Sequence, residues 1–182
     1  IKFSQTDGGR TAFTVEARTN LGFTDGRNLL EDVTVVLFGE DDSIPERRIH
    51  GDRCGYAQAT NDIQCDGNVE MQLDRVTEGR TASMTYSHES RTITTLAFTE
   101  IVRPGAFQGR ADRMSLRVAD NVLDVGGHVR IVLADGAVLE TEAASYDQRA
   151  NLIRVDGGLR MTDARGTVSG TEAEIELNPE TL

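Results

Sequence analysis

Apolar and polar residues alternate along most of the chain, which predicts β-strands rather than helices. In residues 129–133 the odd positions are apolar, and in residues 63–73 the alternation continues through Gly67. No window of eleven residues carries a helical stripe of apolar positions. Turn-forming pairs such as Asp25-Gly26 and Asp135-Gly136 separate the alternating segments. The sequence therefore predicts an all-β protein.

Four consecutive stretches align without a gap at a period of 30 residues. The aligned columns hold Tyr56, Tyr86, Leu116 and Tyr146; Ile63, Ile93, Leu123 and Ile153; Val69, Thr99, Val129 and Leu159; and Met71, Ile101, Ile131 and Met161. A fixed period indicates repeats that stack their apolar faces. We expect one domain over residues 1–182, with a looser unit at 1–46, regular units at 52–81, 82–111, 112–141 and 142–171, and a partial unit at 170–177.

One irregularity recurs inside the units. The residues expected to face inward have odd numbers up to Thr141 and even numbers from Ala144 onward. In a regular strand, such a change of parity would turn the later side chains to the other face. The same change occurs near Asp52 and Asp112. We expect a β-bulge or corner at Asp52, Asp112 and Glu142, so that each unit is a strand that bends and then returns. Residues 82–111 match this pattern least well.

Charge and residue spacing exclude several functions. The net charge of −11 makes nucleic-acid binding improbable, because that binding depends on neutralising phosphates. The three histidines are not at metal-ligand spacing, and the carboxylates occupy turns and bulges rather than a convergent pair. No nucleophile elbow or phosphate loop is present. We expect no enzyme activity, no cofactor and no metal. An acidic loop at residues 39–45 precedes the regular units, and the tail after residue 177 is expected to fray.

The chain has two cysteines, Cys54 and Cys65. If a turn at residues 59–60 closes the hairpin, residues whose numbers sum to 119 face each other, and the two cysteines are such a pair. Directly opposed cysteines can form a cross-strand disulfide, which would indicate an oxidising compartment. The alternative is two small thiols that fill the core.

The repeated columns resemble the OstA-like repeat of lipopolysaccharide-transport proteins. In that pattern an apolar residue, a small residue and an Asp precede a Tyr, and a glycine opens the return strand. It occurs here as Ile49, Gly51, Asp52, Cys54, Tyr56 and residues 66–69, and again around Asp112 and Glu142. The N-terminal part, with residues 12–17 and 30–38 and the acidic loop, is similar to the LptC family, and the unit from Glu142 onward is similar to an additional LptA-type repeat.

This resemblance implies an antiparallel β-jellyroll, or "taco", of two facing sheets with an apolar groove for the acyl chains of lipid A. It implies a periplasmic protein associated with the inner membrane through an anchor outside these residues. It also implies an LptA-like partner at the C-terminal sheet edge and a transporter of the LptB, LptF and LptG type at the N-terminal edge. The expected groove residues are Tyr56, Met71, Met84, Tyr86, Ile101, Phe107, Met114, Leu116, Leu123, Ile131, Leu139, Tyr146, Ile153 and Met161.

Two alternatives stay open. Each expected groove residue could be ordinary core packing. A parallel β-helix, acting as a scaffold or in polysaccharide processing, would also show a fixed period and inward aliphatic columns. Tight turns within each unit favour antiparallel hairpins, so strand direction distinguishes the two folds.

Overall fold

The computed structural model describes residues 1–39, 44–95 and 97–177. The centre of the predicted acidic loop and the predicted frayed tail lie outside these residues. All the regular elements within them are strands: β1 (Lys2–Asp7), β2 (Arg10–Gly22), β3 (Arg27–Leu37), β4 (Arg47–Ala57), β5 (Asp62–Gln72), β6 (Glu78–Ser87), β7 (Thr92–Thr95), β8 (Thr99–Arg103), β9 (Phe107–Ala111), β10 (Arg113–Arg117), β11 (Val122–Leu133), β12 (Val138–Asp147), β13 (Leu152–Asp163) and β14 (Gly166–Glu176).

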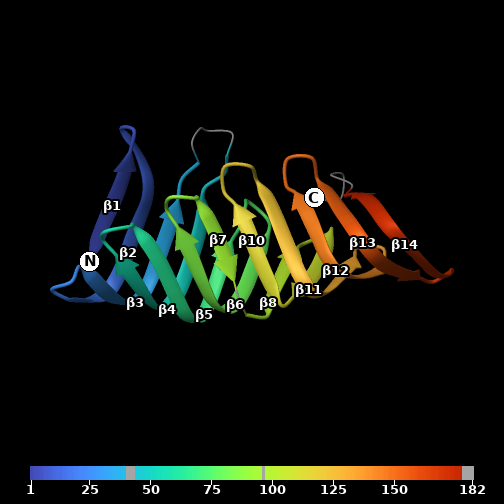
Figure 1. The fold of residues 1–182 in the computed structure, drawn as a ribbon, viewed down its shortest axis with the longest axis horizontal. Helices are drawn as coiled ribbons and strands as arrows, with labels where there is room; N and C mark the ends of the chain where they lie inside the picture. Colours follow the sequence, from blue (N-terminus) through green and yellow to red (C-terminus); the bar gives the residue numbers. More distant parts are fainter. Residues whose placement is uncertain (40–43, 96, 178–182) are drawn as a thin grey trace.

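These strands form one continuous sheet that follows the chain from the N-terminal to the C-terminal end (Figure 1). Consecutive strands are paired except at two places: β7 and β8 both pair with β6, and β9 and β10 both pair with β11. Every pairing between the described strands is antiparallel. The prediction of an antiparallel all-β fold is therefore confirmed, and the parallel β-helix is excluded.

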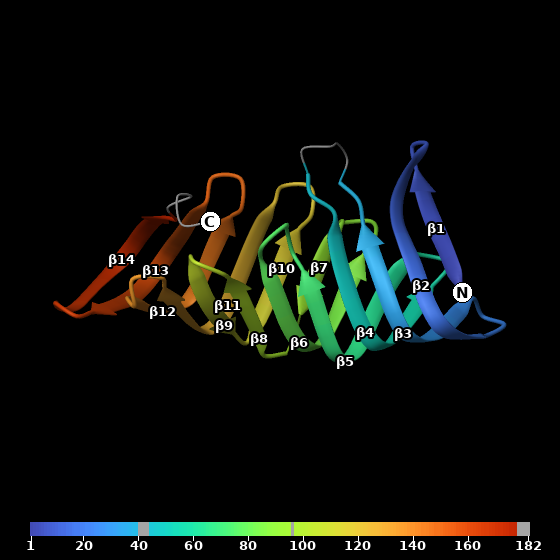
Figure 2. The ribbon, with the colours of Figure 1, turned by 180° about the vertical axis from the view of Figure 1, so that it is seen from behind.

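The sheet bends across its middle, so that two layers face one another (Figures 1 and 2). We call the layer that contains β7 and β10 the first layer, and the layer that contains β8 and β9 the second layer. The long strands cross from one layer to the other. For example, β6 pairs with β7 through Thr85–Ser87 and with β8 through Glu78–Thr81. The two sheets expected from the sequence are thus the halves of one folded sheet.

The bend coincides with the predicted corners. The β4–β5 register shifts between His50 and Arg53, β9 and β10 are separated at Asp112, and the β12–β13 register shifts between Thr141 and Ser145. These positions include Asp52, Asp112 and Glu142, so the three predicted bulges are confirmed. A parity change in the sequence here reports a real change of strand register.

The poorest repeat coincides with a break in the sheet. The strand that would run through residues 92–103 is divided into β7 and β8. On either side of the break, the buried hydroxyls of Thr95 and Thr99 lie 2.7 Å apart and share a hydrogen bond. Thr95 also accepts a hydrogen bond of 3.0 Å from the Met114 amide. Side-chain hydroxyls therefore satisfy polar groups where the backbone ladder is interrupted.

The apolar core lies between the two layers and continues from β2 to β13. Inward positions alternate with outward ones along each strand, as the sequence predicts. Cys54 and Cys65 face each other across β4 and β5 and are joined by a disulfide. Within the described chain there is no helix long and apolar enough to cross a membrane.

Candidate functional site

The expected groove residues line the space between the layers. All except Met161 are buried, and Met161 is partly exposed on β13. They come from both layers: Ile101 and Phe107 lie on β8 and β9, whereas Leu116 lies on β10. The structure therefore brings these residues together in a single apolar interior.

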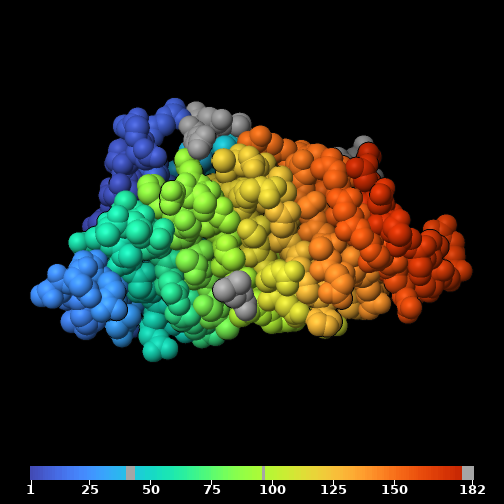
Figure 3. All heavy atoms as spheres, viewed as in Figure 1, coloured from blue at the N-terminus to red at the C-terminus, as the bar shows by residue number. Residues whose placement is uncertain are grey.

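This interior is nearly filled. The space between Ile101, Phe107, Ile131 and Tyr146 holds a cavity of about 20 Å³, lined almost entirely by apolar atoms. That volume accommodates roughly one water molecule. In the space-filling view, side chains cover this face of the molecule from the blue to the orange strands (Figure 3). The molecule is thus in a closed form, with its interior occupied by its own side chains.

The two ends of the interior differ. At the N-terminal end, Phe13 packs edge-to-face against Tyr56, Tyr86 and His88, with ring centroids 6.3, 6.0 and 5.7 Å apart. Sequence reasoning placed Tyr56 and Tyr86 in the groove but missed Phe13, which lies outside the regular repeats. The alternation of apolar and polar residues in segment 12–17 could have identified Phe13 as an inward-facing residue.

At the C-terminal end the interior faces solvent. Strand β14 pairs with β13 and has no second partner among the described residues. Val168 on β14 is 69% exposed, and Leu159 and Ile175 are only partly buried. The strand projects from the body of the molecule (Figure 3, red). Apolar side chains at an unpaired sheet edge are typical of a surface that another strand covers.

The layers also meet on the side opposite the bulges, along a line that we call the seam. Here the turns that end the second layer face the turns that end the first. Among the described residues, no backbone hydrogen bond joins the two layers across the seam. Side chains make the polar contacts between the layers there, and three of the donors are arginines: Arg47, Arg91 and Arg103.

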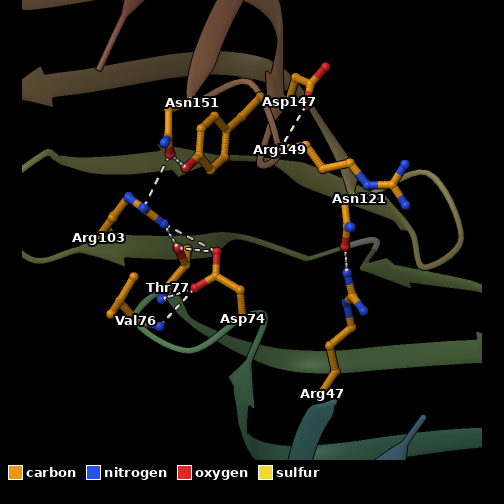
Figure 4. A network of polar contacts seen from close by, with 10 residues as sticks. Arg47, Asp74, Val76, Thr77, Arg103, Asn121, Asp147, Arg149 and Asn151 are labelled. Carbon is orange, nitrogen blue, oxygen red and sulfur yellow. Dashed lines mark hydrogen bonds and ion pairs between the residues drawn. The ribbon is translucent and has the colours of Figure 1, made fainter. Parts of the chain in front are cut away.

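Arg103 is at the centre of the first seam contact (Figure 4). Its guanidinium, at the end of β8, donates to Asp74 at 3.2 Å and to the Thr77 hydroxyl at 3.0 Å in its own layer. It also donates across the seam to Asn151 Oδ1 at 3.2 Å. The Tyr146 ring lies beneath it, 5.9 Å away, and burial raises the pKa of Tyr146 to about 12. The buried Arg103 cation therefore has a carboxylate partner and hydrogen-bond acceptors in both layers.

Arg47, the first residue of β4, is less well satisfied. Its side chain is fully buried, and it donates to the Pro45 carbonyl at 2.8 Å and, across the seam, to Asn121 Oδ1. Its Nε has no hydrogen-bond partner, and Arg47 makes no ion pair within the described residues. Burial lowers the pKa of Arg47 to about 10; Asp74 opposes the shift, and Arg149 and Arg91 add to it. A buried cation with neutral acceptors is energetically costly.

The first-layer residues that contact the seam belong to one column of the repeat. Asn61, Arg91, Asn121 and Asn151 all have positive φ values, between 50° and 60°, in the turns that end each unit. Asn tolerates this conformation better than most residues. Arg91 donates to the Phe38 carbonyl at 2.8 Å, so it also reaches the second layer. The sequence contained this column, but its contacts depend on how the layers meet.

Comparison with known proteins gives the family. The model of the family described as "Lipopolysaccharide-assembly, LptC-related" matches residues 23–134, which is more than half of the chain. The chain belongs to this LptC-related family. The match includes the strands from β3 to β11, and so both layers and the seam arginines Arg47, Arg91 and Arg103. The resemblance inferred from the repeated columns is confirmed.

A solved structure with similarity to this LptC-related chain is that of LptH from Pseudomonas aeruginosa, described as the LptA homologous periplasmic component of the conserved lipopolysaccharide transport device. The two share 13% identity with a TM-score of 0.49, over 63% of this chain and 82% of LptH. No curated protein sequence matches the chain significantly. Among the described residues, no group of three or more His, Cys, Asp or Glu side chains could hold a metal ion.

Proposed function

We propose that this LptC-related protein is a periplasmic component of lipopolysaccharide transport that holds the acyl chains of lipid A between its two layers and performs no catalysis. The observation that carries the proposal is the unbroken apolar interior between the layers, from Tyr56 to Ile153. Burial of hydrocarbon is non-directional and grows with the area removed from water, so such a tract suits acyl chains of varied length.

The closed form sets a condition on this function. A cavity of about 20 Å³ cannot receive an acyl chain, so the layers must move apart before lipid is bound. The bulge side is joined by continuous backbone, whereas side chains hold the seam. Opening along the seam therefore breaks the fewest backbone interactions, and acyl chains replace side-chain contacts within the core.

The unpaired edges of the sheet support a role in passing lipid between proteins. We assign the C-terminal edge, β14, to an LptA-like partner and the N-terminal edge, β1, to a transporter of the LptB, LptF and LptG type. Both strands pair on one side only among the described residues. Addition of a partner strand would extend the sheet and the apolar interior together.

Lipid binding is tested by purifying the protein from a Gram-negative host and measuring its mass under native conditions. We expect a population heavier by one lipopolysaccharide or lipid A molecule, which extraction with organic solvent removes. A second sample, refolded without lipid, should bind added lipid A. The added lipid A should compete with the natural ligand for the protein. Failure of both samples to bind lipid A would overturn the proposal.

The edge assignment is tested by deleting residues 170–182. The truncated protein should lose affinity for an LptA-like partner, whereas deletion of residues 1–7 at the opposite edge should leave that affinity intact. Thermal unfolding of both variants controls for loss of fold. Equal affinity of the two truncated proteins for the partner would contradict the assignment.

A further inference from the structure

The seam contains buried positive charge that is not needed to form its hydrogen bonds. Arg47 and Arg103 lie on the inward-facing side of β4 and β8, two residues from the buried Ile49 and Ile101 respectively. They therefore occupy the rim of the apolar interior, where the alternation would otherwise place an aliphatic residue. In a chain of net charge −11, two buried arginines at the rim are not explained by core packing.

The acceptors available to these arginines are unequal. Arg103 has the carboxylate of Asp74, whereas Arg47 has a backbone carbonyl and an amide oxygen. Arg149, in the turn after β12, is exposed and donates to the Ala119 carbonyl at 3.1 Å. Ala119 lies two residues before Asn121, which accepts a hydrogen bond from Arg47, so Arg149 and Arg47 contact the same turn. They do so from opposite sides of the seam. Asp74, the acidic neighbour that raises the pKa of Arg47, is ion-paired to Arg103 instead.

We infer that the rim at Arg47, Arg103 and Arg149 binds the phosphate groups of the lipid whose acyl chains occupy the interior. Arginine is suited to this task because its planar fork donates two parallel hydrogen bonds to a phosphate. The unpartnered Nε of Arg47 supplies a donor for the second of these bonds. This inference rests on the proposed function and adds the headgroup chemistry to it.

The same contacts explain how the closed form is held without lipid. When the layers are together, Asn121 and Asn151 are substitute acceptors for Arg47 and Arg103. Opening the seam breaks these bonds, and a phosphate at the rim replaces neutral acceptors with a charged one. Hydrogen bonds between two charged groups are stronger than those to a neutral amide. Phosphorylated lipid therefore stabilises the open form in two places, at the interior and at the rim.

The test compares two lipids that differ only in phosphate: lipid A with both phosphates, and the same lipid after their enzymatic removal. Wild-type protein should bind the phosphorylated lipid more tightly. Arg47→Gln should weaken binding of the phosphorylated lipid by roughly tenfold or more. It should not weaken binding of the dephosphorylated lipid, because loss of the Arg47–Asn121 bond makes opening no harder. Arg130→Gln, on the outward face of β11, is the matched control and should change neither affinity.

Three results would overturn the inference. One is an equal loss of affinity for both lipids in Arg47→Gln, and another is no loss for either. The third is equal binding of both lipids by the wild type, which would leave the proposed function intact. If the wild type binds neither lipid, the proposed function itself fails. Arg149→Gln removes an exposed cation and should fold normally, so it repeats the test if Arg47→Gln is unstable; it too should weaken only the phosphorylated lipid.

Free phosphate is separated from lipid phosphate by competition. Inorganic phosphate at millimolar concentration should not displace the phosphorylated lipid from wild-type protein, because it gains nothing from the apolar interior. Complete displacement would show that the rim binds phosphate independently of acyl chains, contrary to the inference.

Discussion

The imidazole of His128 and the carboxylate of Asp112 are joined by a hydrogen bond of 2.7 Å across the bend of the sheet. The equivalent pair two units of the repeat earlier is Asn68, which donates to Asp52 at 2.8 Å. Both His128 and Asn68 have a φ of 45° and follow a glycine that also has positive φ. An aspartate on one strand thus fixes two left-handed residues on the next, and the pair forms the corner.

The His128–Asp112 pair predicts a pH dependence. Its hydrogen bond to Asp112, together with the charges of Asp112 and Glu142, raises the pKa of His128 above 6.5. The stabilisation is therefore complete below pH 6.5 and is lost as the pH rises through the folded-state value. We expect the melting temperature of wild type minus that of His128→Asn to be larger at pH 5.5 than at pH 8.5. In an Asp112→Asn background the difference should depend on pH much less, because only the charge of Glu142 still favours protonated His128. A wild-type difference that grows with pH would contradict this account.

The same corner predicts a steric cost. A Cβ atom at Gly127 would lie 2.6 Å from Asp112 Oδ2, whereas one at Gly136 would meet nothing within 4 Å. Both glycines have positive φ, 74° and 86°. Gly136→Ala should therefore cost about 1–2 kcal/mol from the backbone conformation alone, and Gly127→Ala should cost at least about 1 kcal/mol more. Urea unfolding of the two variants measures the difference. Equal losses would show that the Asp112 contact does not constrain the corner.

The Cys54–Cys65 disulfide predicts a response to reduction. It closes a loop with a sequence separation of 11 residues. Reduction should lower the free energy of unfolding by about 2–3 kcal/mol, because the unfolded chain regains conformational freedom. Guanidinium unfolding with and without dithiothreitol measures this change. The Cys54→Ser/Cys65→Ser double variant should not respond to dithiothreitol, and an insensitive wild type would mean that the bridge is not formed.

The Arg103–Asp74 ion pair predicts a strong coupling. Its N···O distance is 3.2 Å, with both side chains about one-tenth exposed. The Arg165–Asp163 pair has nearly the same distance, 3.0 Å, but the Arg165 side chain is 91% exposed. A double-mutant cycle with Arg103→Met and Asp74→Asn should give a coupling of about 1–3 kcal/mol. The cycle at Arg165 and Asp163 should give less than about 0.5 kcal/mol. Similar couplings at the two sites would mean that burial does not strengthen the Arg103–Asp74 pair.

The fold could be predicted from the sequence because the alternation of apolar and polar residues indicates the register in which neighbouring strands pair. The parity changes at Asp52, Asp112 and Glu142 located the bend, and the sum of residue numbers in the first regular hairpin located the Cys54–Cys65 pair. These features depend on neighbours along the chain or on adjacent strands, which alternation and turn residues specify directly.

The seam could not be predicted in the same way. Arg47 lies in the sequence Glu46-Arg47-Arg48, which is similar to many exposed segments. Only its parity with Ile49 indicated an inward side chain. Its partner, Asn121, lies 74 residues away and in the other layer. Contacts between layers depend on the angle at which the sheet folds, and that angle is not encoded in the period of the repeats.

The central claim is that lipid occupies the space between the layers, and site-specific photo-crosslinking tests it most directly. A crosslinking residue at Ile131 or Leu116 faces the interior, whereas one at Arg130, the residue adjacent to Ile131, faces outward. In cells that produce lipopolysaccharide, the interior positions should yield a lipopolysaccharide adduct after irradiation, and position 130 should yield none. Adducts at position 130 with none at 116 or 131 would place the lipid outside the protein and contradict the account.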